Sequence, residues 1–280
     1  MRCVTNMKHI DPTVSVIMGV RNGGKGLASA IDSILVQTIQ SLEFIICDDG
    51  STDNTRQQIA RYAADDGRIL MICHDMNQGL APTLNHCLHM ARGRYIARMD
   101  ADDLSHPQRL ERQITYLENH PQIAFVGCLA LLRRNGAIVG KRSFPEYPIV
   151  RDFYINQPFL HSTLVFRREA LEAVAGYSEN KHCILCEDYD LLLRLYTEGY
   201  LGANIQETLF TYTLPITAKG NRKIRHRWNE VVTRWQRFQE LGLLPWVLPW
   251  VIKPLVVGLL PEGILSAVKD IYIQEVDAGG

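Results

Sequence analysis

The sequence has no excess charge of either sign, because thirty lysine and arginine residues balance thirty aspartate and glutamate residues. A protein whose general surface binds nucleic acid needs a net positive field, so we expect no nucleic-acid partner. The seven cysteines follow no regular spacing, which makes a poor disulfide framework, and we expect reduced thiols. The first twelve residues lack the apolar core of a signal peptide. These absences favour a cytosolic globular protein.

The first 120 residues alternate short apolar runs with segments of helical spacing. Apolar runs at 14–18, 42–47, 69–73 and 95–99 predict buried strands. Helical spacing follows each of them, with the helices expected near 27–36, after 51, at 80–91 and after 107. Strands that alternate with helices in this way form parallel βαβ units. We therefore expect an α/β fold with a mostly parallel central sheet flanked by helices.

The order of elements changes after residue 120. Strand-like runs at 123–132 and 137–144 flank the turn signal "RRNGA". A strand at 162–167 and a helix near 169–175 are expected next, and "CEDYDLLLRLYTEGY" opens another helix. We expect three parts: an arm at 1–12, a catalytic domain at 13–218 and a helical extension at 219–280.

Three polar loops follow the predicted strands, at residues 19–26, 48–53 and 100–103. Ligands of parallel sheets bind beyond the carboxyl ends of the strands, so these loops should converge. Three carboxylates crowd the last loop and repel one another, so a positive group must compensate them. Asp100 and Asp102 suit Mg²⁺ or Mn²⁺, which prefer oxygen ligands. The alternative is a solvated, helix-capping acidic turn.

The motifs occur in a familiar order: "DDGSTDNT", then "NQGLAPTLNHCLHMARGRYIARMDADD", then "PQRLERQ", then "CEDYD". This order and spacing over residues 13–214 resembles the family-2 glycosyltransferases, which have the GT-A fold. The resemblance implies that Asp49 binds the nucleotide base, that Asp100 lies by the ribose and metal, and that Asp102 coordinates the metal on the diphosphate. It also implies Asp188 as general base with Glu187 beside it. The implied nucleotide-sugar set is Gly19, Arg21, Asp49, Gly79 and Asp100.

By the same resemblance, the chain moves a sugar from a UDP-linked donor to a hydroxyl of a glycan or lipid-linked saccharide, with inversion and with Mn²⁺ or Mg²⁺. The implied pathway is the assembly of a cell-surface polysaccharide or O-antigen. The family often has a proline and an aromatic where this chain has "GVRN", so Arg21 is expected to stack on the base or reach a phosphate. His161 is expected near the acceptor, or else as a hydrogen-bonded structural histidine.

Some features favour other interpretations. "GVRNGGKG" nearly matches a P-loop, which would make a nucleotide hydrolase that depends on Lys25, but Gly26 replaces the hydroxyl that binds the metal. A non-catalytic sugar-nucleotide-binding protein would share the fold. Cys183 and Cys186 form a C-x-x-C without a second pair, which favours packing over zinc. Arg109 is expected to form a charge pair near the acidic turn or on the helix surface.

The tail combines a basic amphipathic segment with an apolar one. Residues 219–237 include a single acid, Glu230, and seven basic residues: Lys219, Arg222, Lys223, Arg225, Arg227, Arg234 and Arg237. Residues 241–260 are apolar apart from Lys253 and contain three prolines. This segment lies at a membrane interface, packs on the protein or on a second copy in a homo-oligomer, or spans the bilayer. We expect a cytoplasmic protein that is peripheral on the inner face of the cell membrane.

Overall fold

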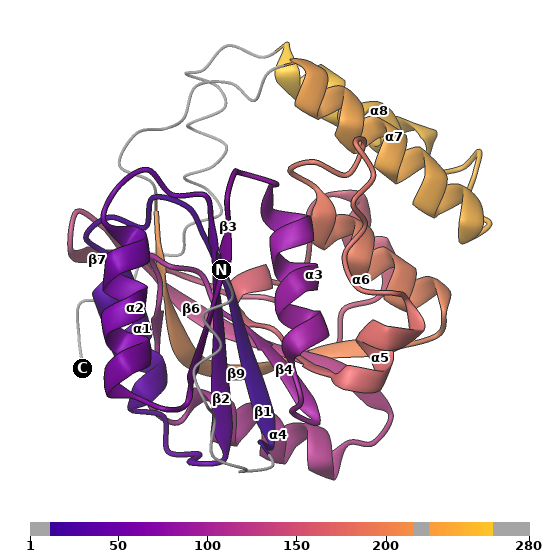
Figure 1. Cartoon of the computed structure of the whole chain (residues 1–280). Helices are drawn as coiled ribbons and strands as arrows, with labels where there is room; N and C mark the ends of the chain where they lie inside the picture. Colours follow the sequence, from indigo (N-terminus) through magenta and orange to yellow (C-terminus); the bar gives the residue numbers. More distant parts are fainter. Residues whose placement is uncertain (1–11, 215–223, 260–280) are drawn as a thin grey trace.

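The computed structural model describes residues 12–214 and 224–259, and every element below lies in these two ranges (Figure 1). The strands are β1 Val14–Val20, β2 Leu42–Asp49, β3 Ile69–His74, β4 Tyr95–Arg98, β5 Leu104–Ser105, β6 Ile123–Arg134, β7 Ala137–Arg142, β8 Val165–Arg167 and β9 Leu201–Thr213. The helices are α1 Leu27–Leu35, α2 Thr55–Asp65, α3 Leu80–Met90, α4 Arg109–Asn119, α5 Arg168–Ala173, α6 Glu187–Thr197, α7 Ile224–Glu240 and α8 Leu248–Gly258. Two 3₁₀ turns are η1 Val150–Tyr154 and η2 His161–Thr163.

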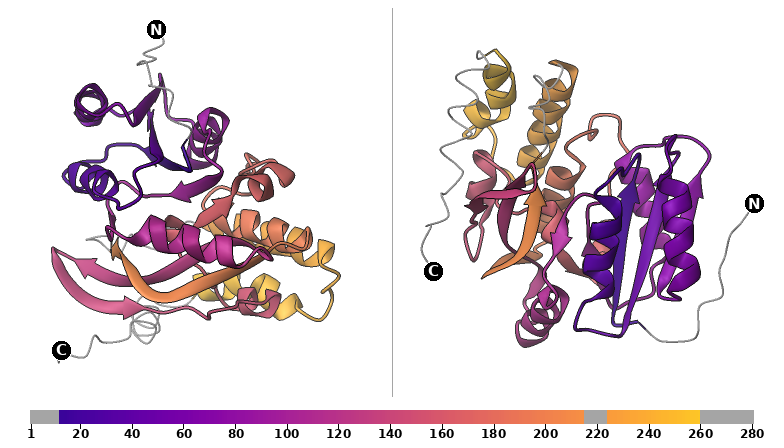
Figure 2. Two further views of the ribbon diagram at one scale, coloured as in Figure 1. Left: turned by 90° about the horizontal axis from the view of Figure 1, so that it is seen from below. Right: turned by 90° about the vertical axis from the view of Figure 1, so that its left-hand side faces the viewer.

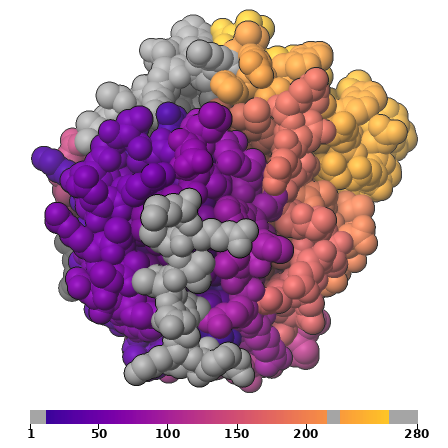
Figure 3. Space-filling view, viewed as in Figure 1, coloured from indigo at the N-terminus to yellow at the C-terminus, as the bar shows by residue number. Residues whose placement is uncertain are grey.

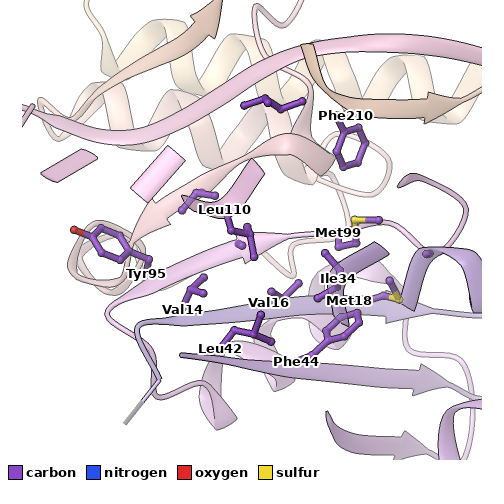
Figure 4. Packing of buried hydrophobic residues seen from close by; sticks show 14 of the residues in the cluster. Val14, Val16, Met18, Ile34, Leu42, Phe44, Tyr95, Met99, Leu110 and Phe210 are labelled. Carbon is purple, nitrogen blue, oxygen red and sulfur yellow. The ribbon is translucent and has the colours of Figure 1, made fainter. Parts of the chain in front are cut away.

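The first half of the sheet is parallel, as predicted. β1 lies between β2 and β4, and β2 pairs with β3, all in parallel register. Alternate residues of β1 enter opposite cores: Val14 and Val16 belong to one apolar cluster and Ile17 to the other. Figure 4 shows Val14 and Val16 packed beside Leu42 of β2. Both faces of these strands are therefore buried, which explains their nearly continuous apolar sequence.

The second half of the sheet is mixed, which corrects the expectation of a mostly parallel sheet. The strand order is β3-β2-β1-β4-β8-β6-β9-β5, with β7 paired to β6. β8 runs antiparallel to both β4 and β6, while β6 runs parallel to β9. The strand expected at 162–167 begins only at Val165, because the residues before it form η2. The expected hairpin around "RRNGA" is present as β6 and β7.

The tail helices pack on the α6 end of the molecule, far from α1 and α2 (Figure 2). Phe238 of α7 and Val251 of α8 are buried in the same apolar cluster as Tyr189 of α6. Arg237 of α7 also forms an ion pair with Asp190 of α6, with 3.0 Å between Nε and Oδ1. The tail therefore extends the second core of the domain.

Two of the basic residues of the tail are buried in the protein. Arg227 and Arg234 are buried, and Arg234 pairs with Glu230 and donates to the carbonyl of Tyr154. These two arginines of the basic amphipathic segment therefore bind the protein itself and do not face solvent or a bilayer. Lys219, Arg222 and Lys223 lie outside the described residues.

The helices α7 and α8 lie at the upper right of Figure 3, and large apolar side chains on and between them are exposed. Trp246 is 87% exposed and Leu259 is 80% exposed, values that are unusual for such large apolar groups. The other exposed apolar residues here are Ile224, Trp228, Trp235, Leu248, Trp250, Ile252 and Val256. Among the described helices, none combines the length and apolar character needed to cross a bilayer.

Candidate active site

The loops that follow β1 and β2 are joined by hydrogen bonds. The backbone N–H of Asn22 donates to the Ser51 hydroxyl at 2.9 Å, and the N–H of Gly23 donates to Thr55 Oγ1 at 2.8 Å. In return, Asn22 Oδ1 accepts the N–H of Thr52 at 2.9 Å. These reciprocal bonds hold residues 22–23 against the start of α2.

The acidic loop contacts the same region through Gly26. A Cβ at this position would lie 3.1 Å from Asp102 Cα, a tight contact that a glycine avoids, so the two backbones approach closely here. On its other side, the Asp102 carbonyl accepts the Thr213 hydroxyl from β9 at 2.5 Å. The three polar loops therefore meet at the carboxyl ends of β1, β2 and β4, as the sequence predicts.

Asp49 ends β2 and joins it to the start of α3. Its Oδ1 accepts the N–H of Gln78 at 2.8 Å and its Oδ2 accepts the N–H of Gly79 at 2.9 Å, while His74 Nδ1 lies 3.0 Å from Oδ1. Burial alone would raise the pKa of Asp49, but these donors outweigh it and hold the pKa below its usual range. A carboxylate offers about four acceptor sites, so roughly one remains for a ligand.

Gly19 and Gly79, both predicted to bind the nucleotide sugar, frame the start of α3. Gly79 has φ +96°, a conformation that favours glycine, and it directs its N–H toward Asp49. A Cβ on Gly19 would lie 2.9 Å from Thr83 Cγ2 of α3. Arg21 is exposed on the loop that directly follows β1. The structure brings these residues together around the end of β1.

The acidic loop contains its own positive partner, Arg98, which the sequence analysis did not identify. Arg98 is 1% exposed at the end of β4, and its Nη2 lies 2.5 Å from Asp100 Oδ1. An arginine in an otherwise apolar strand is the only sequence signal for this pair. A metal is therefore not the sole compensation for the crowded carboxylates.

Asp102 and Asp103 differ sharply in their surroundings. Asp102 is exposed, and partial desolvation followed by the charge of Asp100 raises its pKa. Asp103 is buried and accepts the N–H of Thr213 at 2.8 Å, and burial followed by the charge of Asp100 raises its pKa to about 8. Asp103 thus anchors the loop to β9, a role that the sequence did not reveal.

The residues of the acidic loop fit a hard divalent cation. Asp102 exposes its carboxylate, and the side chain of Asp100 is 35% exposed while only one of its oxygens pairs with Arg98. Carboxylate oxygens are the ligands that Mg²⁺ and Mn²⁺ prefer. A cation between the two would also remove the repulsion that raises the pKa of Asp102.

Glu187 and Asp188 begin α6. Asp188 accepts the N–H of Tyr189 at 2.8 Å and the side-chain amide of Gln157 at 3.1 Å, so both of its oxygens are oriented. Burial, followed by the charge of Asp188, raises the pKa of Glu187 to about 7. The positive charge of Arg98 acts in the opposite direction on this pKa. A carboxyl that titrates near neutral pH suits proton transfer.

His161 belongs to a buried layer that also contains Arg98. Its Nε2 is hydrogen-bonded to the Tyr177 hydroxyl at 2.8 Å. Burial, followed by the charge of Arg98, lowers the pKa of His161 well below its usual value, so the ring is neutral. His161 therefore has the surroundings of a hydrogen-bonded structural histidine. Its contact with the acceptor sugar stays a prediction.

Two other predicted features have structural roles. Arg109 is completely buried, and within the described part of the chain it donates to the carbonyls of Arg98 and Ser162 instead of pairing with a carboxylate. The expected charge pair is wrong, because the two terminal nitrogens of the buried guanidinium donate to backbone oxygens. Cys183 and Cys186 are buried under α7, which agrees with packing.

Comparison with known proteins agrees with this architecture. The model of the family described as "Glycosyl transferase family 2" matches residues 15–175. EpsE of Bacillus subtilis is 37% identical over 91% of this chain and 92% of its own length. The Escherichia coli protein "UDP-Glc:alpha-D-GlcNAc-diphosphoundecaprenol beta-1,3-glucosyltransferase WfgD" is 35% identical over 69% of this chain and 73% of its own.

Among solved structures, the mannosyltransferase PcManGT from Pyrobaculum calidifontis, in complex with GDP-Man and Mn²⁺, is similar with a TM-score of 0.63. The similarity covers 96% of this chain and 82% of that one at 21% identity, so it shows the fold alone. The mixed sheet with flanking helices is therefore the GT-A fold.

Proposed function

Since the chain belongs to glycosyl transferase family 2, we propose that it transfers a sugar from a UDP-sugar to a hydroxyl of a glycan or lipid-linked saccharide during cell-surface polysaccharide assembly. Because the family consists of glycosyltransferases, the chain is interpreted as a glycosyltransferase. The two alternatives, a P-loop nucleotide hydrolase and a non-catalytic sugar-nucleotide-binding protein, are not supported. The observation that carries the finer proposal is the acidic loop, which is held against the loops after β1 and β2 and leaves Asp102 exposed beside the Asp100–Arg98 pair.

The donor end of the site is built around Asp49. Its remaining acceptor site would bind an N–H of the base, and uracil offers one such donor. Arg21, exposed on the neighbouring loop, would stack on the base or reach a phosphate. WfgD, by its name, uses UDP-Glc, whereas PcManGT was solved with GDP-Man, so the choice of uracil follows the more similar relative.

Asp100 and Asp102 would hold Mn²⁺ or Mg²⁺ at the diphosphate. The ion supplies Lewis-acid stabilisation of the departing nucleotide diphosphate when it is bound. Arg98 fixes the orientation of Asp100 through their ion pair. Asp103 holds the loop through Thr213, so the exposed carboxylate of Asp102 would face the donor from an anchored backbone.

The acceptor end is formed by the start of α6. Asp188 would take the proton from the acceptor hydroxyl as the sugar is transferred, and displacement assisted by one base inverts the anomeric centre. Gln157 holds the carboxylate of Asp188 from the other side. Glu187 would tune this step, because its pKa near 7 makes its own charge depend on pH in the neutral range. His161 would support the acceptor side through Tyr177.

The exposed apolar surface of α7 and α8 supports a peripheral position on the inner face of the cell membrane. Tryptophan and aliphatic side chains at a helix surface favour the interface between lipid and water. A Trp246→Ser, Trp250→Ser double variant should bind anionic vesicles at least about tenfold more weakly in a flotation assay. Equal binding of wild type and variant would remove this part of the proposal. A homo-oligomer stays a prediction.

A thermal-shift screen of nucleotide sugars with and without Mn²⁺ tests the proposed function. A ligand that binds only the folded state raises the midpoint by mass action. A UDP-sugar should stabilise the wild type only with Mn²⁺, and Asp102→Ala should abolish the shift. Asp65→Ala, which removes an exposed acid at the end of α2, serves as the matched control and should keep it. No shift with any nucleotide sugar, or a full shift in Asp102→Ala, would contradict the proposal.

A further inference from the structure

Three potential metal ligands gather behind Asp49, away from the acidic loop. They are Cys47 of β2, His74 at the end of β3 and His86 of α3, and their ligand atoms all lie within 4.8 Å of one another. Cys47 Sγ lies 3.6 Å from His74 Nε2, and that nitrogen lies 3.0 Å from His86 Nδ1. A tetrahedral ion with bonds of about 2.0–2.3 Å separates neighbouring ligands by roughly 3.3–3.6 Å, so the sulfur already fits and the two imidazoles need to part by a few tenths of an ångström.

The ring of His74 is oriented as in known metal sites. Its Nδ1 is 3.0 Å from Asp49 Oδ1, which directs Nε2 toward Cys47 and His86. A histidine ligand commonly donates its second ring nitrogen to a carboxylate in this way, which fixes the tautomer. The His74 and His86 rings lie nearly parallel, at an interplanar angle of 12°. The ligand atoms are therefore arranged in advance by three separate elements.

We propose that Cys47 Sγ, His74 Nε2 and His86 Nδ1 bind a zinc ion. One thiolate and two imidazoles suit zinc, whereas Mg²⁺ and Mn²⁺ prefer oxygen. Binding forms a sulfur–zinc bond and releases the thiol proton of Cys47 to solvent. Three protein ligands leave one tetrahedral position for water. His86 is exposed while Cys47 and His74 are buried, so the ion enters from the His86 side.

Such a site is separate from the proposed donor metal and does not depend on the transfer reaction. It would tie β2, β3 and α3 together behind the carboxylate of Asp49. Without a metal, His74 Nε2 and His86 Nδ1 are hydrogen-bonded to each other, and the experiment below distinguishes the two arrangements.

The test uses the full-length protein, stripped of metal and kept reduced, and titrates it with zinc against a chromophoric chelator. Wild type should bind one equivalent that is lost in His86→Gln, with affinity lower by about 100-fold or more. His89→Gln, one turn further along the exposed side of α3, is the matched control and should bind as wild type does. Because His86 is exposed, its replacement should leave the fold intact.

Two further measurements make the test decisive. Cobalt in place of zinc should give a thiolate-to-metal charge-transfer band that Cys47→Ser lacks and that Cys73→Ser, at an exposed cysteine, retains. Asp102→Ala should bind zinc normally, since it affects only the donor metal. Equal zinc affinity in His86→Gln and His89→Gln, absence of the cobalt band, or loss of zinc in Asp102→Ala would each overturn the proposal.

Discussion

Replacing Arg98 with methionine tests whether the protein itself balances the acidic loop. The Arg98 side chain is 1% exposed and pairs with Asp100 at 2.5 Å, while methionine keeps the apolar stem without the charge. Removing one partner of a buried ion pair costs about 3–5 kcal/mol, because the other charge stays behind unpaired. The Asp100 side chain is 35% exposed and keeps some hydration, so we expect a loss near the lower limit, about 3 kcal/mol.

Urea unfolding in the presence of a chelator measures this loss. The midpoint should fall while the m-value stays constant, which identifies a change in stability and not in compactness. Adding Asp100→Asn should restore part of the loss, with a coupling free energy of about 1–2 kcal/mol in the double-mutant cycle. Arg112→Met is the control: its exposed pair with Glu207, at 3.9 Å, should contribute less than about 1 kcal/mol. A similar small loss for Arg98→Met, or additive effects in the cycle, would refute the reasoning.

Three other variants extend these expectations. The pKa of Glu187 rises from 4.5 to about 7 on folding, so the unfolded chain ionises first and wild type loses stability between these pH values. Glu187→Gln should not show this loss. Between pH 5 and pH 8, urea unfolding should find that wild type loses about 2 kcal/mol more stability than the variant, a figure reduced from the full shift for partial hydration. Parallel pH profiles of the two proteins would contradict this expectation. Gly26→Ala places a Cβ 3.1 Å from Asp102 Cα and should weaken Mn²⁺-dependent donor binding in a thermal-shift titration, whereas Gly67→Ala, with open space around it, should not. Gln157→Ala should lower kcat about tenfold and leave the KM for the donor unchanged, because Gln157 orients the carboxylate of Asp188 and does not contact the donor. A change in KM alone would exclude this role.

The parallel half of the fold could be predicted from sequence because its signals are local. Val14 and Val16 lie in an apolar, β-branched run, and each such run is followed by helical spacing, which determines both the element and its neighbour in the sheet. The mixed half depends on pairings between distant segments. β9 pairs with β6 more than seventy residues earlier, as in Asn204 beside Gly127, and no local pattern reports such a pairing.

The candidate site shows the same division. Asp49, Asp100 and Asp102 could be proposed because they lie at or just beyond the carboxyl ends of strands, where ligands of α/β sheets bind, and because their motifs resemble those of the family. Arg98 was not found, because its importance comes from complete burial, which a single charged letter in a strand does not reveal. The Cys47, His74 and His86 cluster was also not found, since its members come from three elements and lack a short spacing motif.

The docking of α7 on α6 determines how the chain can be shortened. Asp190 is completely buried and contacts arginines from two helices, Arg194 of α6 at 2.8 Å and Arg237 of α7 at 3.0 Å. Cutting the protein after the last strand of its sheet would open that carboxylate and the contacts of Phe238 to water, directly behind the residues that begin α6. A version trimmed after β9 should therefore be less stable at the start of α6, where the proposed general base Asp188 lies, and truncation for solubility should stop beyond α8.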